Sequence, residues 1–152
     1  MSDSIQIRPA SDEEAGLLVE FNRAMAAESE DKGLDVDTLR RGVDYLLGHP
    51  AEGFYLLAEC DGEVAGTLMV TYEWSDWRAG RFWWIQSVYV RPEHRRRGVY
   101  RALHRHVRDL ATLDEQACGL RLYVERDNRG AMATYRNLGM EETHYRLYEE
   151  EF

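Results

Sequence analysis

The stretch from Gln86 to Leu103 holds the residues best suited to chemistry in this sequence of 152 residues. An apolar run ends at Pro92, the arginines Arg95–Arg97 follow, and Gly98 precedes an amphipathic segment. Helix starts attract anions through unpaired N–H groups and the helix dipole, and glycine lets the backbone come close to a bound group. Arginine pairs with phosphate oxygens. The segment predicts a phosphate or pyrophosphate site, although a solvated basic helix start also fits these residues.

The charge distribution favours a local anion site. The formal net charge is −9, yet seven of the nineteen Lys and Arg residues fall within positions 91–108. Phosphate backbones reward a basic surface, so this acidic chain is not expected to have nucleic acid as its main partner.

The predicted site needs a strand before it and a helix after it. Alternation predicts a strand over Phe82–Val90. The helix that follows has the inward positions Val99, Leu103, Val107 and Leu110. A strand formed by residues 120–124 could then lie parallel to the preceding strand across a right-handed crossover.

The remaining elements predict a mixed α+β fold, with a sheet covered by helices. Expected before residue 82 are a strand at Ile5–Arg8 that ends before Pro9, a helix capped by Ser11, a helix at Asp37–Leu47, and strands at Phe54–Glu59 and Val64–Tyr72 joined by an Asp61-Gly62 turn. Expected after residue 124 are a helix capped by Asp127 or Asn128 and ended by Gly139, and a strand over Thr143–Tyr148.

Length and composition favour one domain over residues 1–152. The sequence shows no run of about eighteen apolar residues and no basic and apolar blocks after Met1, so we expect a cytoplasmic protein that does not enter membranes. Cys60 and Cys118 lack the spacing of a metal or redox motif, so no metal is expected.

Two motifs resemble those of the GCN5-related N-acetyltransferase (GNAT) superfamily. The run Arg95, Arg96, Arg97, Gly98 and Val99 is similar to its acyl-CoA binding motif, but Tyr100 stands where the family has Gly or Ala. The second motif lies downstream: Asn128, Ala131, Tyr135 and Gly139-Met140 resemble the family series on its last helix. The expected element order also matches, so the resemblance covers nearly the whole chain.

The resemblance implies a mostly antiparallel sheet of 6–7 strands with helices on both faces and a splayed, parallel central strand pair. It also implies acetyl-CoA as cosubstrate. Backbone amides of Val88 and Val90 would then bind the pantetheine arm and polarise the thioester carbonyl. The residues implied to bind the rest of the coenzyme are Arg95, Arg96, Arg97, Gly98, Val99, Tyr100, Arg101 and Asn128.

N-acetyl transfer by an attacking amine needs an acid that protonates the leaving thiolate and a base that accepts the ammonium proton. The resemblance makes Tyr135 the candidate acid, although it could simply pack on its helix. Glu73 is the first choice for the base, followed by Glu28 and Asp76. Each of these three carboxylates also reads as an ordinary surface group.

The acceptor is expected to be a primary amine. Four tryptophans surround the turn at residues 75–81, namely Trp74, Trp77, Trp83 and Trp84. They suit a core or a homodimer contact, and one or two could wall a pocket for a cationic amine. Two rival functions are a non-catalytic acyl-CoA sensor and a nucleic-acid binder that uses residues 94–108.

Overall fold

The computed structural model describes residues 4–30 and 33–152, without the side chain of Glu30. The chain divides into two compact units, residues 1–122 and 123–152. The single domain expected from the sequence stays a prediction.

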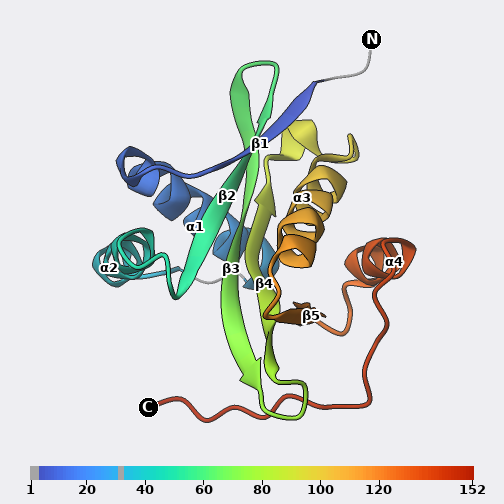
Figure 1. Ribbon diagram of the computed structural model, residues 1–152. Coiled ribbons are helices and arrows are strands. Elements are labelled where there is room, and N and C mark those ends of the chain that lie inside the picture. Colours follow the sequence, from blue (N-terminus) through green and yellow to red (C-terminus); the bar gives the residue numbers. More distant parts are fainter. Residues whose placement is uncertain (1–3, 31–32) are drawn as a thin grey trace. The chain divides into compact units, whose positions relative to one another are not determined.

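One sheet organises the first unit, as Figure 1 shows. Its described strands are β1 (Ile5–Pro9), β2 (Gly53–Cys60), β3 (Glu63–Ser75), β4 (Gly80–Val90) and β5 (Ala117–Arg121). They lie in the order β1-β2-β3-β4-β5. The first four strands pair antiparallel, whereas β5 runs parallel to β4. This arrangement confirms the predicted mixed α+β class.

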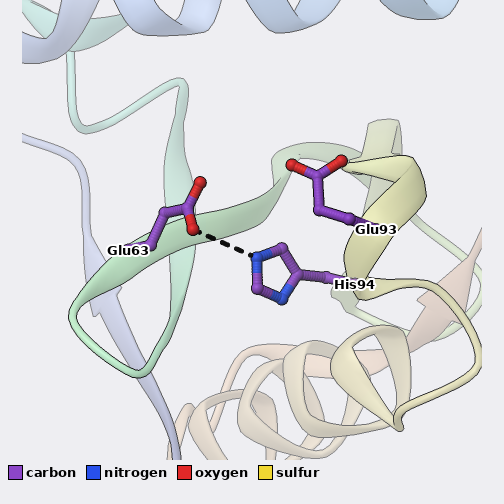
Figure 2. A group of neighbouring side chains, drawn as sticks. All are labelled: Glu63, Glu93 and His94. Carbon is purple, nitrogen blue, oxygen red and sulfur yellow. Dashed lines mark ion pairs between the residues drawn. The ribbon is translucent and has the colours of Figure 1, made fainter.

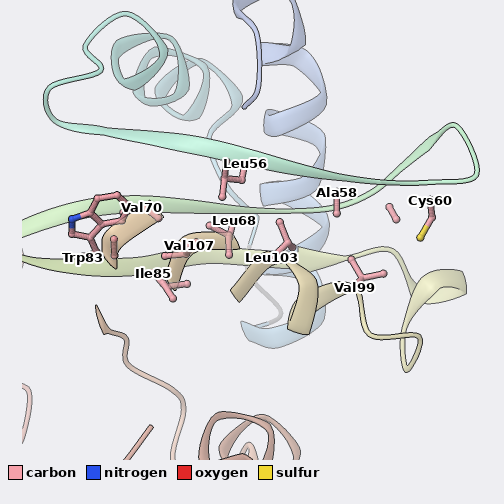
Figure 3. Close-up of a cluster of buried hydrophobic side chains, with 12 residues drawn as sticks. Leu56, Ala58, Cys60, Leu68, Val70, Trp83, Ile85, Val99, Leu103 and Val107 are labelled. Atoms are coloured by element: carbon pink, nitrogen blue, oxygen red, sulfur yellow. The ribbon is translucent and has the colours of Figure 1, made fainter. Parts of the chain in front are cut away.

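Helices cover both faces of this sheet, as predicted. They are α1 (Ala15–Glu30), α2 (Val36–Leu47) and α3 (Val99–Leu113), with short 3-10 helices η1 (Asp12–Glu14) and η2 (Pro92–His94). Residues of α1 and α2 pack with Tyr55 and Leu57 in one apolar cluster. Residues of α3 pack with Leu56 and Ala58 in the other cluster (Figure 3). Strand β2 is therefore buried on both faces, which explains its nearly continuous apolar sequence.

Local turn chemistry follows the sequence closely. Asp61 and Gly62 have φ values of 53° and 80°, the left-handed pair that a two-residue hairpin turn requires. At the start of the first helical segment, the Ser11 N–H donates to the Glu14 carboxylate over 2.9 Å. This bond satisfies an N–H group at the helix start.

The expected strand count of 6–7 is wrong, because the described residues form five strands. Residues 143–148 form no strand despite their alternating pattern. Tyr145, Leu147 and Tyr148 are 62%, 68% and 91% exposed. Alternation alone does not make a strand; the backbone also needs a neighbouring edge with which to pair.

Two further expectations near α3 need correction. The strand predicted over residues 120–124 is β5 at Ala117–Arg121, because its ladder with β4 ends at the pair Trp84–Arg121. In the sheet order β5 stands at an edge, so the parallel pair is not central. On α3, Leu110 is 36% exposed, whereas Ala111 is buried and continues the inward series from Leu103 and Val107 at four-residue spacing.

The second unit contains α4 (Arg129–Asn137). The Asn128 side chain accepts the Ala131 N–H over 3.1 Å and so caps the helix, as one of the two predicted alternatives. At the other end, Gly139 has a φ of 97°. The Met140 N–H donates to the Tyr135 carbonyl and the Gly139 N–H to the Arg136 carbonyl, each over 3.0 Å. This is the Schellman pattern, which satisfies the last carbonyls of a helix.

Candidate active site

The turn that leads into α3 contains two left-handed residues. Arg96 has a φ of 64° and Gly98 a φ of 82°. A Cβ placed on Gly98 would meet no described atom within 4 Å, apart from those of the two neighbouring residues in the chain. The backbone conformation, rather than crowding, therefore requires the glycine, and the space beside it can receive a ligand.

The start of α3 directs backbone amides toward this space. The Ala102 N–H donates to the Gly98 carbonyl over 3.0 Å as the first bond of the helix. The N–H groups of residues 99–101 precede that bond and lie at the positive end of the helix dipole. The first turn of α3, described in full, carries no acidic side chain. These features fit the predicted pyrophosphate site.

Tyr100, the departure from the family motif, leaves this turn accessible. Its side chain packs partly buried against the apolar cluster beneath α3. Its hydroxyl lies 3.1 Å from Nδ1 of His104, one turn along the helix. The large side chain thus extends along α3, and only the backbone of Tyr100 contributes to the predicted anion site.

The arginines of the basic segment divide into two groups. The Arg91 Nε donates to the Val64 carbonyl, and the Arg95 Nε to the Val90 carbonyl, each over 2.9 Å. Arg95 also donates to the Glu28 carboxylate over 2.6 Å. Both side chains connect the turn to the rest of the fold, so a phosphate role for Arg95 competes with a structural one. The side chains of the second group, Arg96, Arg97 and Arg101, are exposed.

A β-bulge separates the two halves of β4. Thr67 pairs with Tyr89 and Met69 with Gln86, so the single residue Leu68 faces two residues, Ser87 and Val88. Ser87 has a φ of 52°, a left-handed value at the bulge. Such bulges bend a strand and redirect its groups.

Beyond the bulge, one edge of β4 has no neighbouring strand among the described residues. Strand β5 pairs only with residues 81–84 of β4. The Arg91 N–H donates to the Ala65 carbonyl of β3 over 2.8 Å. Because alternate N–H groups of a strand point to opposite edges, the Val90 N–H faces away from β3. This edge suits the role predicted for the Val88 and Val90 amides.

The predicted base Glu73 lies far from this edge. Glu73 pairs in register with Phe82, six residues from Val88, or about 20 Å along the strand. Its carboxylate accepts a hydrogen bond from Arg121. The second choice, Glu28, is bound to Arg95, which in turn contacts Val90. The third choice, Asp76, is exposed in the β3–β4 hairpin. The geometry therefore favours Glu28 among the three.

Sequence reasoning missed a polar pair between β3 and β4. The half-buried Gln86 donates through its amide to the Thr71 hydroxyl. Gln86 directly precedes the bulge, where it interrupts an apolar strand. That interruption was the available sign, because a polar residue inside an apolar strand needs a partner. The hydrogen bond holds the side chain of Gln86 against β3, next to the bulge.

The second unit carries the candidate acid. Tyr135 is half-buried on α4, and burial raises the pKa of its phenol. A phenol with a raised pKa stays protonated at neutral pH. Asn128 is engaged as the cap of α4, so its predicted contact with the coenzyme would be additional to that role.

The tryptophans occupy different environments. Trp83 is buried at 6% exposure, whereas Trp74 and Trp77 are 62% and 87% exposed. Trp84 is half-buried. The exposed pair lies at the β3–β4 hairpin, and Trp83 belongs to the core, one of the environments expected for these tryptophans.

The fold and the turn at Gly98 define a mixed α+β protein in which a left-handed glycine begins α3 and the first helical turn carries no acidic side chain. The model of the acetyltransferase (GNAT) family matches residues 17–140. The chain therefore belongs to this family and is an acyl-CoA-dependent acetyltransferase. The family uses acetyl-CoA.

Known proteins agree with this assignment. The chain is similar to the crystal structure of a possible acetyltransferase from Clostridium difficile 630, with 43% identity, a TM-score of 0.89 and coverage of 97% of each chain. It is 29% identical to a thialysine N-epsilon-acetyltransferase from Bos taurus, over 91% of this chain and 85% of the relative. The structure of a predicted acetyltransferase with acetyl-CoA from Clostridium acetobutylicum shares the fold, with a TM-score of 0.79, 18% identity and coverage of 97% and 96%. None of the described helices is long and apolar enough to cross a membrane.

Proposed function

We propose that this enzyme transfers the acetyl group of acetyl-CoA to a primary amine by direct attack. The observation that carries the proposal is the left-handed turn at Gly98, with which α3 begins. This turn follows the part of β4 that pairs with β3 but not with β5. The turn suits a diphosphate, and the edge suits an extended arm that bears amide groups. Together they suit coenzyme A.

In this proposal the backbone does most of the binding. The amides of residues 97–101 bind the pyrophosphate, with Arg96 and Arg97 adding charge. The amides of Val88 and Val90 bind the pantetheine arm, and one of them polarises the thioester carbonyl. Arg95 and Asn128 keep their structural bonds and approach the coenzyme from the turn and from the start of α4.

The reaction itself needs two proton transfers. The amine nitrogen forms a bond to the carbonyl carbon, the carbon–sulfur bond breaks, and the sulfur takes a proton. Tyr135 supplies that proton, because its phenol, whose pKa burial raises, is protonated at neutral pH. A carboxylate takes the ammonium proton, and Glu28 now stands ahead of Glu73, whose distance along β4 leaves it a water-relayed role at most.

We further propose an acceptor with an aliphatic primary amine. The relative from Bos taurus is a thialysine N-epsilon-acetyltransferase, and thialysine carries such an amine. The half-buried Trp84, on the same strand as Val88 and Val90, is the aromatic residue that we propose for contact with the cationic amine. A non-catalytic acyl-CoA sensor remains the alternative, and it would bind acetyl-CoA without releasing thiol in the presence of amines.

A free-thiol assay with acetyl-CoA and a panel of amines tests the transfer, and calorimetry tests binding of the coenzyme. Aliphatic amines of the lysine type should release thiol faster than aromatic amines or alcohols. Binding without thiol release across the panel would support the sensor. Absence of coenzyme binding would contradict both functions.

Substitution tests the proton donor. Tyr135→Phe should lower kcat by about 100-fold or more, because general acid catalysis commonly contributes that much. Tyr148→Phe is the matched control in the same unit, since Tyr148 is 91% exposed. A Tyr135→Phe enzyme with full kcat across the pH range would remove Tyr135 from the mechanism.

A further inference from the structure

Three side chains that could bind a metal ion meet at the end of the β2–β3 hairpin. Glu63 is the first residue of β3, and Glu93 and His94 belong to η2. One ligand atom from each of the three lies within 4.8 Å of the other two. Figure 2 shows the Glu63 carboxylate beside the imidazole of His94 and the Glu93 carboxylate on the neighbouring turn.

His94 is the observation that points to a ligand. It is 6% exposed, and neither ring nitrogen has a hydrogen-bond partner among the described residues. Its Nε2 lies 3.5 Å from Oε2 of Glu63, longer than an ordinary N–H···O hydrogen bond. A buried polar group without a partner is costly. A cation between the imidazole and the carboxylates would give one ring nitrogen of His94 and the carboxylate oxygens a partner.

The local structure holds the two halves of this cluster together. The Asp61-Gly62 turn starts β3 at Glu63. The Arg91 Nε donates to the Val64 carbonyl over 2.9 Å, and the Arg91 carbonyl accepts the His94 N–H over 2.9 Å. Arg91 thus connects the first residues of β3 to η2. The ligand residues need little rearrangement to meet around an ion.

The ligand types select the class of metal. Imidazole suits zinc, copper, iron and nickel, whereas magnesium and calcium prefer oxygen ligands alone. Two carboxylates and one neutral imidazole carry a charge that a divalent cation neutralises. Three protein ligands leave further positions to water.

We propose that Glu63, Glu93 and His94 form a binding site for a divalent transition-metal ion of the zinc type, which joins the β2–β3 hairpin to η2. The site is independent of the acetyl-transfer chemistry, because none of the three residues belongs to the proposed coenzyme or acceptor contacts. Because His94 lies four residues before Gly98, a bound ion would hold the segment that leads into α3 against the start of β3.

Calorimetric titration of the full chain with Zn²⁺ tests the proposal. One ion should bind, and Glu63→Gln and Glu93→Gln should each weaken binding by about tenfold or more, the scale seen when metal-site residues are altered. Glu115→Gln and His144→Gln change exposed residues elsewhere and should leave the affinity unchanged. Mg²⁺ should bind far more weakly than Zn²⁺.

Cobalt supplies a second readout. Co²⁺ bound by oxygen and nitrogen ligands gives visible d–d bands without the charge-transfer band of a thiolate, so a thiolate band would place the ion at a cysteine and overturn the proposal. His94→Gln should abolish the d–d bands; if that variant does not fold, the two glutamate variants decide. No Zn²⁺ binding, or unchanged binding in both glutamate variants, would show that His94 and Glu63 form only an ion pair.

Discussion

His104 is a fully buried histidine on α3, at 0% exposure. Burial, with a smaller contribution from the charge of Arg108, lowers its pKa to about 4 from the ordinary 6.5. The folded protein therefore holds His104 neutral at pH values where the unfolded chain would bind a proton. The hydroxyl group of Tyr100, one turn earlier on the helix, lies 3.1 Å from Nδ1 of His104.

This difference predicts acid sensitivity. The folded pKa is depressed, so the contribution of His104 to stability is complete above about pH 6.5 and is lost as the pH falls toward 4, by up to about 3 kcal/mol. Urea unfolding at several pH values measures the effect. His104→Leu should remove this part of the pH dependence, and His144→Leu, at an exposed position, should not. An unchanged slope in His104→Leu would contradict the assignment.

At the residue scale, the residues that could be predicted from the sequence are those that form turns and helix caps. Gly98, Asn128 and Gly139 act within a few positions of themselves, and turn and cap chemistry identified them. The contact of Arg95 with Glu28 joins residues 67 positions apart, so no local pattern could announce it. The polar pair of Gln86 with Thr71 depends on strand register in the same way.

At the scale of elements, the start of α3 gives a paired test of the Gly98 turn. Gly98→Ala should lower the free energy of unfolding by about 1 kcal/mol, because an L-residue is strained at a φ of 82°. Gly42 lies exposed inside α2 with open space around it, so Gly42→Ala should stabilise the protein by a similar amount. Opposite signs in denaturant unfolding are expected. Coenzyme affinity should fall only in the Gly98 variant.

A charged cluster fastens β1 to η1 and β2. Arg8 donates to Glu14 over 2.7 Å and to Glu59 over 2.8 Å. The hydrogen bonds from Arg8 lower the pKa of Glu14 to about 2 from 4.5. The stabilisation is therefore present above about pH 4.5 and is lost as the pH falls toward 2.

Glu14→Gln should cost about 1 kcal/mol at neutral pH, at the upper end for a partly exposed ion pair. The difference from the unchanged protein should shrink as the pH approaches 2. Glu13→Gln is the neighbouring control, because Glu13 is exposed. Thermal unfolding across this pH range checks the prediction, which fails if the two variants behave alike.

The elements were predictable where periodicity and tertiary pairing agree. Strands β1–β4 and helices α1–α3 follow their apolar patterns within a few residues. Residues 120–124 and 143–148 show the opposite case, since their alternation fits a strand but the ladder with β4 stops at Arg121 and the tail is exposed. Pairing depends on partners that a single segment does not contain.

At the scale of the whole molecule, the homodimer expected from the sequence stays a prediction. Trp74 and Trp77 expose large apolar surface at the β3–β4 hairpin, and such surface often marks a contact between proteins. Light scattering after size exclusion should give twice the chain mass. Replacing both tryptophans by serine should then give the mass of one chain, and a monomeric unchanged protein would refute the expectation.

The bulge in β4 also determines which of the two apolar clusters the odd-numbered residues of each half of the strand join. Trp83 and Ile85 point into the cluster beneath α3, whereas Tyr89 joins the cluster beneath α1 and α2. In an unbroken strand all odd-numbered positions would share one side. The extra residue reverses this parity, so deleting Ser87 would move Val88 and Val90 to the face of α1 and α2 and Tyr89 to the face of α3. One inserted residue thereby places odd-numbered side chains on one face of the sheet before the bulge and on the other face after it.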